Sequence, residues 1–202
     1  SLLLKAAQFS IAFTDNDSEQ LPDTLKELTL EQHQDGISDT FFNNLPMKLT
    51  TLNLFQQRGF THKNLSYLPP TLTHLSIVAK NIKETGFKNL PKSLQHLHLI
   101  GPTASLANLK LGDFNALRIL LMDAPSGLKS AFFISRLPTS LTTLEIGAIN
   151  NQLAPESAPK LPAHLLCLCL YGAGPELCTA SFPKSLKTCI VRSERVDALP
   201  FS

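Results

Sequence analysis

Leucine and other apolar residues recur along this chain in a ten-position pattern, L-P-x-x-L-x-x-L-x-L, in which x is mostly polar. The copy at 90–99 reads LPKSLQHLHL, and the copy at 113–122 keeps Leu117 and Leu120 but lacks the opening Leu-Pro. The copies occupy residues 21–30, 45–54, 68–77, 90–99, 113–122, 137–146, 161–170 and 182–191. Successive copies begin 21 to 24 residues apart. A period of this length predicts a solenoid of stacked repeats rather than a single compact core.

The segment L-x-x-L-x-L of each copy predicts a β-strand, because alternate residues of a strand point to opposite faces. Its leucines are expected to point inward and the residues between them outward. A proline precedes the strand in seven of the copies, a position that tolerates a residue without an N–H group. Repeats that enter their strands in the same way should stack them parallel and in register, about 4.8 Å apart.

The other half of each repeat predicts short turns and a second buried column. Helical turns are expected at 38–43, with Ser38 or Asp39 as the N-cap, and at 129–136. Long helices are not expected, because the connections are short and contain glycines. The second buried column is predicted to consist of Phe41, Leu65, Phe87, Leu109, Phe133, Ala158 and Leu177.

We interpret the chain as one domain with three parts. Residues 1–20 are expected to form a degenerate first repeat or an N-terminal cap, with residues 2–13 placed on the pattern. Residues 21–192 would hold about eight repeats. Residues 193–202 contain Leu199-Pro200, which predicts either the start of a further repeat or a C-terminal cap.

Composition narrows the classes of function. Charged residues make up 17% of the chain and the net charge is +2, so no block of like charge favours nucleic acid or an anionic membrane. No run approaches the roughly 18 apolar residues of a membrane span. All four cysteines lie in the last third, with Cys189 at an inward position, Cys167 and Cys169 at outward positions, and Cys178 between strands. We interpret them as reduced thiols in a cytosolic environment, since disulfides are rare in reducing compartments.

Parallel strands in register would arrange the outward residues in three columns across one face of the sheet. The first column is predicted to be Glu27, Thr51, His74, His96, Ile119, Thr143, Cys167 and Thr188. The second is predicted to be Thr29, Asn53, Ser76, His98, Leu121, Glu145, Cys169 and Ile190. The third is predicted to be Glu31, Phe55, Val78, Ile100, Asp123, Gly147, Tyr171 and Arg192.

His74, His96 and His98 would lie together on this face, and three imidazoles can bind zinc with one coordination position open. Two observations weigh against a metal site. Side chains on flat parallel strands diverge, and neither histidine-bearing strand carries a carboxylate that would orient the rings. Solvent-facing histidines are the simpler interpretation, so these residues form only a weak candidate for a metal site.

Cys167 and Cys169, with Glu145 on the neighbouring strand, are candidates for a nucleophilic site. A nucleophilic thiol needs a base held against it, and the nearest histidine, His164, belongs to the turn before the strand. No glycine-rich phosphate loop, H-E-x-x-H motif or G-x-S-x-G motif occurs. The sequence therefore predicts neither an enzyme nor a bound cofactor.

Apolar residues gather among the later outward positions, at Ile119, Leu121, Leu166, Cys167, Cys169 and Tyr171. Exposed apolar patches with polar surroundings mark partner sites, and aromatic residues suit binding hot spots. The alternative is that a loop or a cap of the same chain covers this patch. The residues predicted to bind a partner protein are Phe55, His74, His96, His98, Ile119, Leu121, Asp123, Glu145, Cys169 and Tyr171. Nothing in the sequence predicts an oligomeric state.

With these residues in view, the sequence resembles the leucine-rich-repeat family. Its L-P-x-S-L-x-x-L-x-L copies at 90–99 and 137–146 are similar to FNIP-type repeats of amoebae and to LPX-type repeats of translocated bacterial effectors of the Legionella type. The asparagine that follows the strand in vertebrate-type repeats is absent here, so irregular curvature is expected.

The resemblance implies an α/β leucine-rich-repeat solenoid, with a curved parallel sheet on the concave face and short helices, 3-10 turns and loops on the convex face. It also implies a protein partner, which for an effector would be a host protein met in the host cytoplasm. An alternative that the resemblance implies is a repeat domain that recruits substrates for a larger assembly, such as a ubiquitin ligase.

Overall fold

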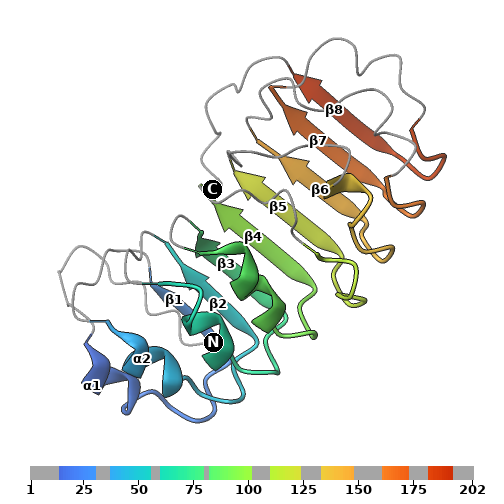
Figure 1. Cartoon of the computed structure of the whole chain (residues 1–202). Coiled ribbons are helices and arrows are strands. Elements are labelled where there is room, and N and C mark those ends of the chain that lie inside the picture. The colour runs from blue at the N-terminus through green and yellow to red at the C-terminus, as the bar shows by residue number, and fades with distance from the viewer. Residues whose placement is uncertain are drawn as a thin grey trace.

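The structure, a computed structural model, contains a sheet of eight parallel strands in sequence order (Figure 1). It describes residues 14–30, 37–55, 60–79, 82–101, 110–123, 133–147, 161–172 and 182–192. The strands are β1 (Glu27–Leu30), β2 (Thr51–Leu54), β3 (His74–Val78), β4 (His96–Ile100), β5 (Ile119–Asp123), β6 (Thr143–Ile146), β7 (Cys167–Tyr171) and β8 (Thr188–Arg192). Every strand lies where the ten-position pattern predicts one, and the predicted solenoid class is confirmed.

The register of the sheet is the one that the pattern predicts. His74 pairs with His96, and His96 pairs with Ile119, as in the first predicted column. Ser76 pairs with His98, as in the second. Because the repeats enter their strands in the same way, no strand is shifted relative to its neighbours and equivalent side chains lie side by side.

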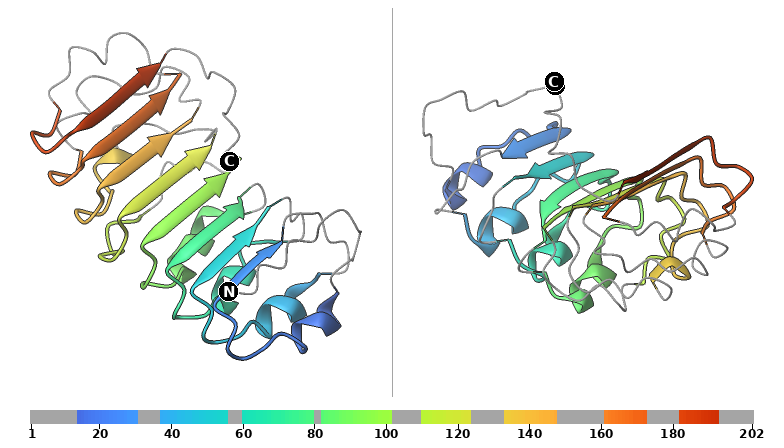
Figure 2. Two further views of the ribbon diagram at one scale, coloured as in Figure 1. Left: turned by 180° about the vertical axis from the view of Figure 1, so that it is seen from behind. Right: turned by 90° about the horizontal axis from the view of Figure 1, so that it is seen from above.

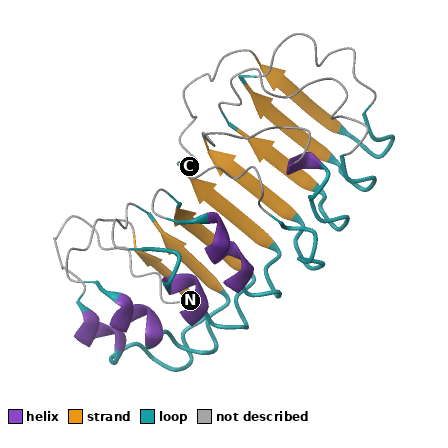
Figure 3. Cartoon of the chain, viewed as in Figure 1, coloured by secondary structure: helices purple, strands orange, loops and turns teal. Residues whose placement is uncertain are grey.

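Short helices occupy the side of the solenoid opposite the sheet (Figure 3). They are α1 (Asp15–Ser18), α2 (Asp39–Asn43) and the 3-10 helices η1 (Asn64–Tyr67) and η2 (Glu84–Asn89). Seen from above, the strands follow the inner side of an arc and the helices its outer side (Figure 2). We call the outward-facing side of the sheet the concave face. None of the helices in the described ranges is long and apolar enough to cross a membrane.

The helix predicted at 38–43 is present, with Ser38 as its N-cap. The Ser38 hydroxyl accepts a hydrogen bond from the Thr40 N–H at 3.2 Å. The Ser38 hydroxyl donates to the Asp15 carboxylate of α1, which also accepts from the Ser38 and Phe41 N–H groups at 2.8 and 3.3 Å. The hydroxyl bond, followed by the two N–H bonds, lowers the pKa of Asp15. In the second predicted helical segment, 129–136, Phe133 and Ile134 are helical, and residues before 133 lie outside the described part of the chain.

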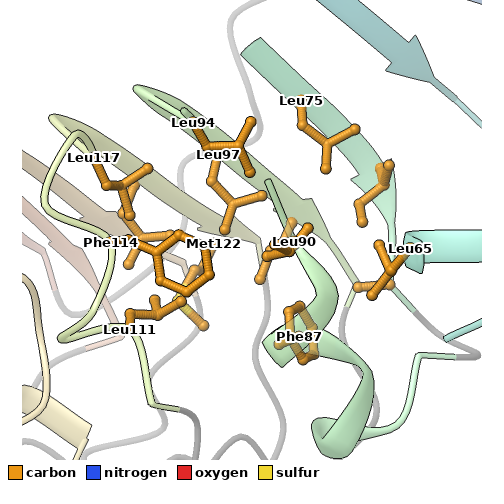
Figure 4. Close-up of a cluster of buried hydrophobic side chains, with 14 of the residues drawn as sticks. Leu65, Leu75, Phe87, Leu90, Leu94, Leu97, Leu111, Phe114, Leu117 and Met122 are labelled. Carbon is orange, nitrogen blue, oxygen red and sulfur yellow. The ribbon is translucent and has the colours of Figure 1, made fainter. Parts of the chain in front are cut away.

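The hydrophobic core lies between the sheet and the outer turns (Figure 4). The inward strand leucines, such as Leu97 and Leu99, have no exposed surface. Phe41, Leu65, Phe87 and Phe133 of the predicted second column are at most 2% exposed, whereas Leu109, Ala158 and Leu177 lie outside the described residues. In the repeat without Leu-Pro, the buried Leu111 and Phe114 fill the equivalent region.

Hydroxyl groups in the turns before β3, β4, β6 and β8 join these repeats to the repeats that precede them. The Ser93 hydroxyl lies 2.7 Å from the Pro70 carbonyl oxygen and 2.6 Å from that of Leu72, both in the preceding repeat. Thr71 and Ser140 make the same pair of bonds from the equivalent position, and Ser185 donates to the Leu165 carbonyl oxygen of the preceding repeat. We call Thr71, Ser93, Ser140 and Ser185 the hydroxyl ladder. It provides side-chain bonds between repeats in a chain that lacks the asparagine of vertebrate-type repeats.

Cys189 differs from the expectation for an inward position. Its backbone pairs with Leu168, so its register is the predicted one, but its side chain is exposed. Leu186 and Val191 of the same repeat are only partly buried. The reason is that an inward residue is covered by the repeats on both sides, and within the described ranges no repeat packs beyond β8.

Candidate functional site

The concave face carries the predicted columns, but its outward positions differ in exposure. Thr29, Asn53, His96 and His98 are half-buried, and Glu27 and His74 are exposed. Ser76 and Cys169, which are outward by register, are only 7% and 8% exposed. Neighbouring side chains cover these two small residues, so their outward register positions do not leave them open at the surface.

The other residues of the predicted partner site are all half-buried: Phe55, Ile119, Leu121, Asp123, Glu145 and Tyr171. The residues of this site come from β3, β4, β5, β6 and β7, except Phe55, which follows β2. The sheet therefore brings the predicted site residues onto one face. Glu31 of the third column lies outside the described residues.

The His74 and His96 rings pack edge to face, with 5.6 Å between their centroids and 66° between their planes. The Thr73 hydroxyl lies 2.9 Å from Nδ1 of His74. Burial, followed by the nearby His74 and His98, lowers the pKa of His96 below its ordinary value of 6.5. Nε2 of His96 is buried and has no hydrogen-bond partner among the residues that the structure describes. His96 is therefore a neutral imidazole near pH 7, packed mainly through its ring.

His98 is fixed by partners on the strands at both sides. The Ser76 hydroxyl of β3 lies 3.1 Å from Nδ1, and the Asp123 carboxylate of β5 lies 3.2 Å from Nε2. A carboxylate only accepts hydrogen bonds, so Nε2–H donates to Asp123 and, in the neutral ring, Nδ1 accepts from Ser76. The sequence contained the signal for the Asp123 contact, because Asp123 lies diagonally across the register from His98, on the neighbouring strand that carries no histidine.

Ser76, His98 and Asp123 are in contact in series, as the serine, histidine and aspartate of a hydrolase triad are. A triad needs an accessible nucleophile and N–H groups directed at the developing oxyanion. Ser76 is 7% exposed, and β3 is paired with strands on both sides, which engages its backbone amides in the sheet. The arrangement can orient the His98 ring but does not present a nucleophile.

The three histidines do not converge on one point. Both ring nitrogens of His98 are engaged by Ser76 and Asp123, whereas His74 and His96 contact each other through their rings. In the part of the chain that the structure describes, no three His, Cys, Asp or Glu residues are placed to hold a metal ion. The geometry gives the weak zinc candidate no support.

Cys167 and Cys169 point to the same side of β7, and their sulfur atoms are 3.9 Å apart. Burial, with smaller contributions from Cys167, Glu145 and Cys189, raises the pKa of Cys169 to about 12. A thiol with a raised pKa is a poor nucleophile. Among the described contacts, His164 makes no hydrogen bond to either sulfur, so the expected weakness of the nucleophilic site follows from its geometry.

Apolar side chains lie in two groups on this part of the molecule, one on β4 and β5 and one at β7, with Thr143 and Glu145 of β6 between them. Ile100, Ile119, Leu121 and Tyr171 are half-buried, and Leu166 is 39% exposed. We call these five residues the apolar patch. Because Leu166 and its neighbours keep solvent-exposed surface, the chain leaves the patch partly open. The polar cluster of Ser76, His74, His96, His98 and Asp123 adjoins it through the pairing of β4 with β5.

Comparison with known proteins adds information about the fold. No family model matches the sequence, and no curated protein matches it. The structure is similar to a leucine-rich repeat-containing protein, LegL7, from Legionella pneumophila, with a TM-score of 0.56 and 19% sequence identity. The match covers 88% of this chain and 69% of that one. A circular leucine-rich-repeat protein, CroV588, matches with a TM-score of 0.47 and 20% identity, over 85% of this chain and 28% of that one.

The likeness to LegL7 shows that the chain has the fold of a leucine-rich-repeat solenoid. Such folds commonly serve protein–protein interaction, using the extended inner surface that the stacked repeats create. The closer resemblance to LPX and FNIP repeats remains a prediction from the sequence.

Proposed function

We propose that this chain is a binding module that recognises a partner protein through its concave face. The observation that carries the proposal is the apolar patch lying beside an ordered polar cluster on the inner side of the arc. Half-buried apolar residues next to fixed polar groups are what a specific protein interface needs, because burial supplies affinity and directed hydrogen bonds supply register.

The dimensions of the face support a protein partner rather than a small ligand. Seven spacings of about 4.8 Å between eight strands give a face roughly 34 Å long. A surface of this length can receive a folded element or an extended segment of about ten residues at 3.3 Å each.

The polar cluster is already ordered in the unbound chain. Ser76 and Asp123 hold the His98 ring from both sides, so little side-chain freedom remains to be lost when a partner binds. Each long side chain immobilised at an interface costs about 0.5–1.5 kcal/mol, which an ordered group avoids. We infer that the cluster sets the position of the partner and that Leu121 and Tyr171 of the apolar patch supply most of the affinity.

The test is a double variant, Leu121→Asp with Tyr171→Ala, compared with a matched control on the rest of the surface. The control is Met47→Asp with Tyr67→Ala, because Met47 and Tyr67 are 62% and 40% exposed and lie away from the strands. Captured proteins are identified by cross-linking and mass spectrometry, and both variants are first checked by thermal melting. The proposal expects the concave variant to lose a partner that the control retains. Equal capture by the two folded variants would refute it.

We further propose that the partner is a host protein and that the chain acts as a bacterial effector in host cytoplasm. Support comes from the LPX-type form of the repeats and from the likeness of the fold to a Legionella pneumophila leucine-rich-repeat protein. A partner captured from amoebal lysate through the concave face, and absent from bacterial lysate, is the expected result. A concave-face partner found only in bacterial lysate would contradict the effector role and leave the binding proposal standing.

A further inference from the structure

The thiols of β7 lie on the concave face, and the proposed function does not use their reactivity. We propose that Cys167 and Cys169 form a two-sulfur chelating site for a thiophilic metal ion or metalloid, of the class represented by cadmium and trivalent arsenic. The proposed chemistry goes beyond partner binding, although Cys169 is also one of the residues predicted to face the partner. It stands on the spacing of the two sulfurs, on their position on a rigid strand and on the burial of one of them.

The spacing of the sulfur atoms fits one bridging atom. Two sulfurs bonded to a single ion at about 2.3 Å stand about 3.8 Å apart at a tetrahedral angle and about 4.6 Å apart when collinear. The Sγ atoms of Cys167 and Cys169 are 3.9 Å apart. The pair therefore lies close to the bent arrangement before any ligand arrives.

The same geometry disfavours a disulfide between these residues. A disulfide bond is about 2.05 Å long and needs Cβ atoms that approach to about 3.8 Å. Residues two apart on a strand are separated by about 6.6 Å, with side chains that stand nearly parallel. Closing an S–S bond would distort β7, which is hydrogen-bonded to β6 and to β8. A bridging atom spans the gap without that distortion, so the pair is suited to chelation rather than to oxidation.

The rigidity of β7 favours chelation over two separate reactions. Cys169 is 8% exposed and sits between the paired residues Glu145 of β6 and Ile190 of β8. A first sulfur–ligand bond at the half-exposed Cys167 holds the ligand beside the second sulfur. Intramolecular capture of this kind raises affinity by about 10²- to 10⁴-fold over a single contact.

The two probe reactions balance without an oxidant or a reductant. Phenylarsine oxide reacts with two neutral thiols, forming two arsenic–sulfur bonds and releasing one water molecule that takes both thiol protons. Cadmium ion forms two cadmium–sulfur bonds and releases two protons to solvent. Because burial raises the pKa of Cys169 to about 12, cadmium binding must remove a tightly held proton and should strengthen as the pH rises.

The remaining cysteines can be removed from the experiment. Cys189 pairs with Leu168 in the inward column, so it points to the opposite face of the sheet from Cys167 and Cys169. Cys178 lies outside the described residues. A variant with Cys178→Ser and Cys189→Ser keeps only the two cysteines of the proposed pair, and we call it the background protein. Adding Cys167→Ser or Cys169→Ser to the background protein removes one of the two remaining sulfur atoms.

The experiment titrates phenylarsine oxide into this background protein and follows free thiols and intact mass. We expect one phenylarsenic bridge per chain, loss of both thiols together, and reversal by a dithiol but not by a monothiol. Cys167→Ser and Cys169→Ser should each lower the affinity for phenylarsine oxide by about 10²-fold or more. Cadmium should give the ultraviolet absorption of a dithiolate in the background protein and not in either variant.

Two results would overturn the site. One is a folded background protein, confirmed by thermal melting, that forms no bridge although it forms one after denaturation. The other is equal affinity in the background protein and in folded Cys167→Ser, which would mean that only one sulfur binds. If Cys169→Ser does not fold, the Cys167→Ser comparison alone decides.

Discussion

Replacing Ser93 by alanine tests whether the hydroxyl ladder stabilises the stacking of repeats. The Ser93 side chain is half-buried, and its hydroxyl lies within 2.7 Å of the Pro70 and Leu72 carbonyl oxygens of the preceding repeat. One hydroxyl has a single proton, so the two contacts form one shared, three-centre hydrogen bond. The substitution removes this bond and leaves the apolar core unchanged.

The expected loss follows from the energy of one hydrogen bond and the partly buried acceptors that it leaves. A net hydrogen bond contributes about 0.5–1.5 kcal/mol, and an acceptor left without a partner adds to the loss. We expect the free energy of unfolding to fall by about 1–2 kcal/mol. For a chain of 202 residues this corresponds to a decrease in Tm of about 2–8 °C.

Two further variants control the experiment. Ser93→Thr should melt close to the wild type, because Thr71 makes the same two contacts from the equivalent position. Ser66→Ala removes an exposed hydroxyl whose described hydrogen bond is to Lys63 within its own turn, so it should change stability by no more than about 0.5 kcal/mol. Urea melts should show a lower midpoint with an unchanged slope. If Ser93→Ala and Ser66→Ala had the same midpoint, the ladder would not stabilise the stacking.

Three other predictions follow from the packing and from the histidines. Leu97→Asp buries a carboxylate at a position with no exposed surface, and it should abolish the cooperative thermal transition. An unchanged melting curve would mean that Leu97 does not point inward. Because the pKa of His96 is lowered, the unfolded chain takes up a proton more readily, so the free energy of unfolding should fall as the pH drops through about 6.5. His96→Asn should lack that part of the pH dependence in denaturant melts, and an identical pH profile would contradict the assignment. Gly86→Ala places a Cβ 2.6 Å from Cβ of His62 and should lower the free energy of unfolding by about 1–3 kcal/mol. Gly112→Ala is the control, because its added Cβ has its nearest contact at 3.7 Å and should leave stability nearly unchanged. Equal melting curves for the two variants would rule out the close approach at Gly86.

The proposed interface and the proposed dithiol site share one face but differ in what they need. Partner binding requires only that Leu121 and Tyr171 keep accessible surface, whereas chelation requires that a reagent reach Cys169 at 8% exposure. A variant that loses one property and keeps the other would therefore separate the two sites.

The strands, their order and their register could all be read from the sequence. A ten-position pattern repeated every 21 to 24 residues assigns each leucine to the core, and alternation along a strand then fixes which residues share a column. For this reason His74 and His96 were correctly predicted to be neighbours. The sequence narrowed the N-cap of α2 to Ser38 or Asp39, because an N-cap depends on residues next to it in the chain, and the structure shows that it is Ser38.

Contacts between repeats were decided by the tertiary structure. The bonds of His98 to Ser76 and Asp123 depend on side chains from neighbouring strands, as does the burial of Ser76 and Cys169. The exposure of Cys189 depends on how many repeats stack beside it. A periodic pattern specifies which face a side chain occupies but carries no information on how far that side chain reaches across the sheet. The sequence therefore determined the solenoid and the columns of its concave face, whereas packing between adjacent repeats determined which members of those columns are ordered, buried or open to a partner.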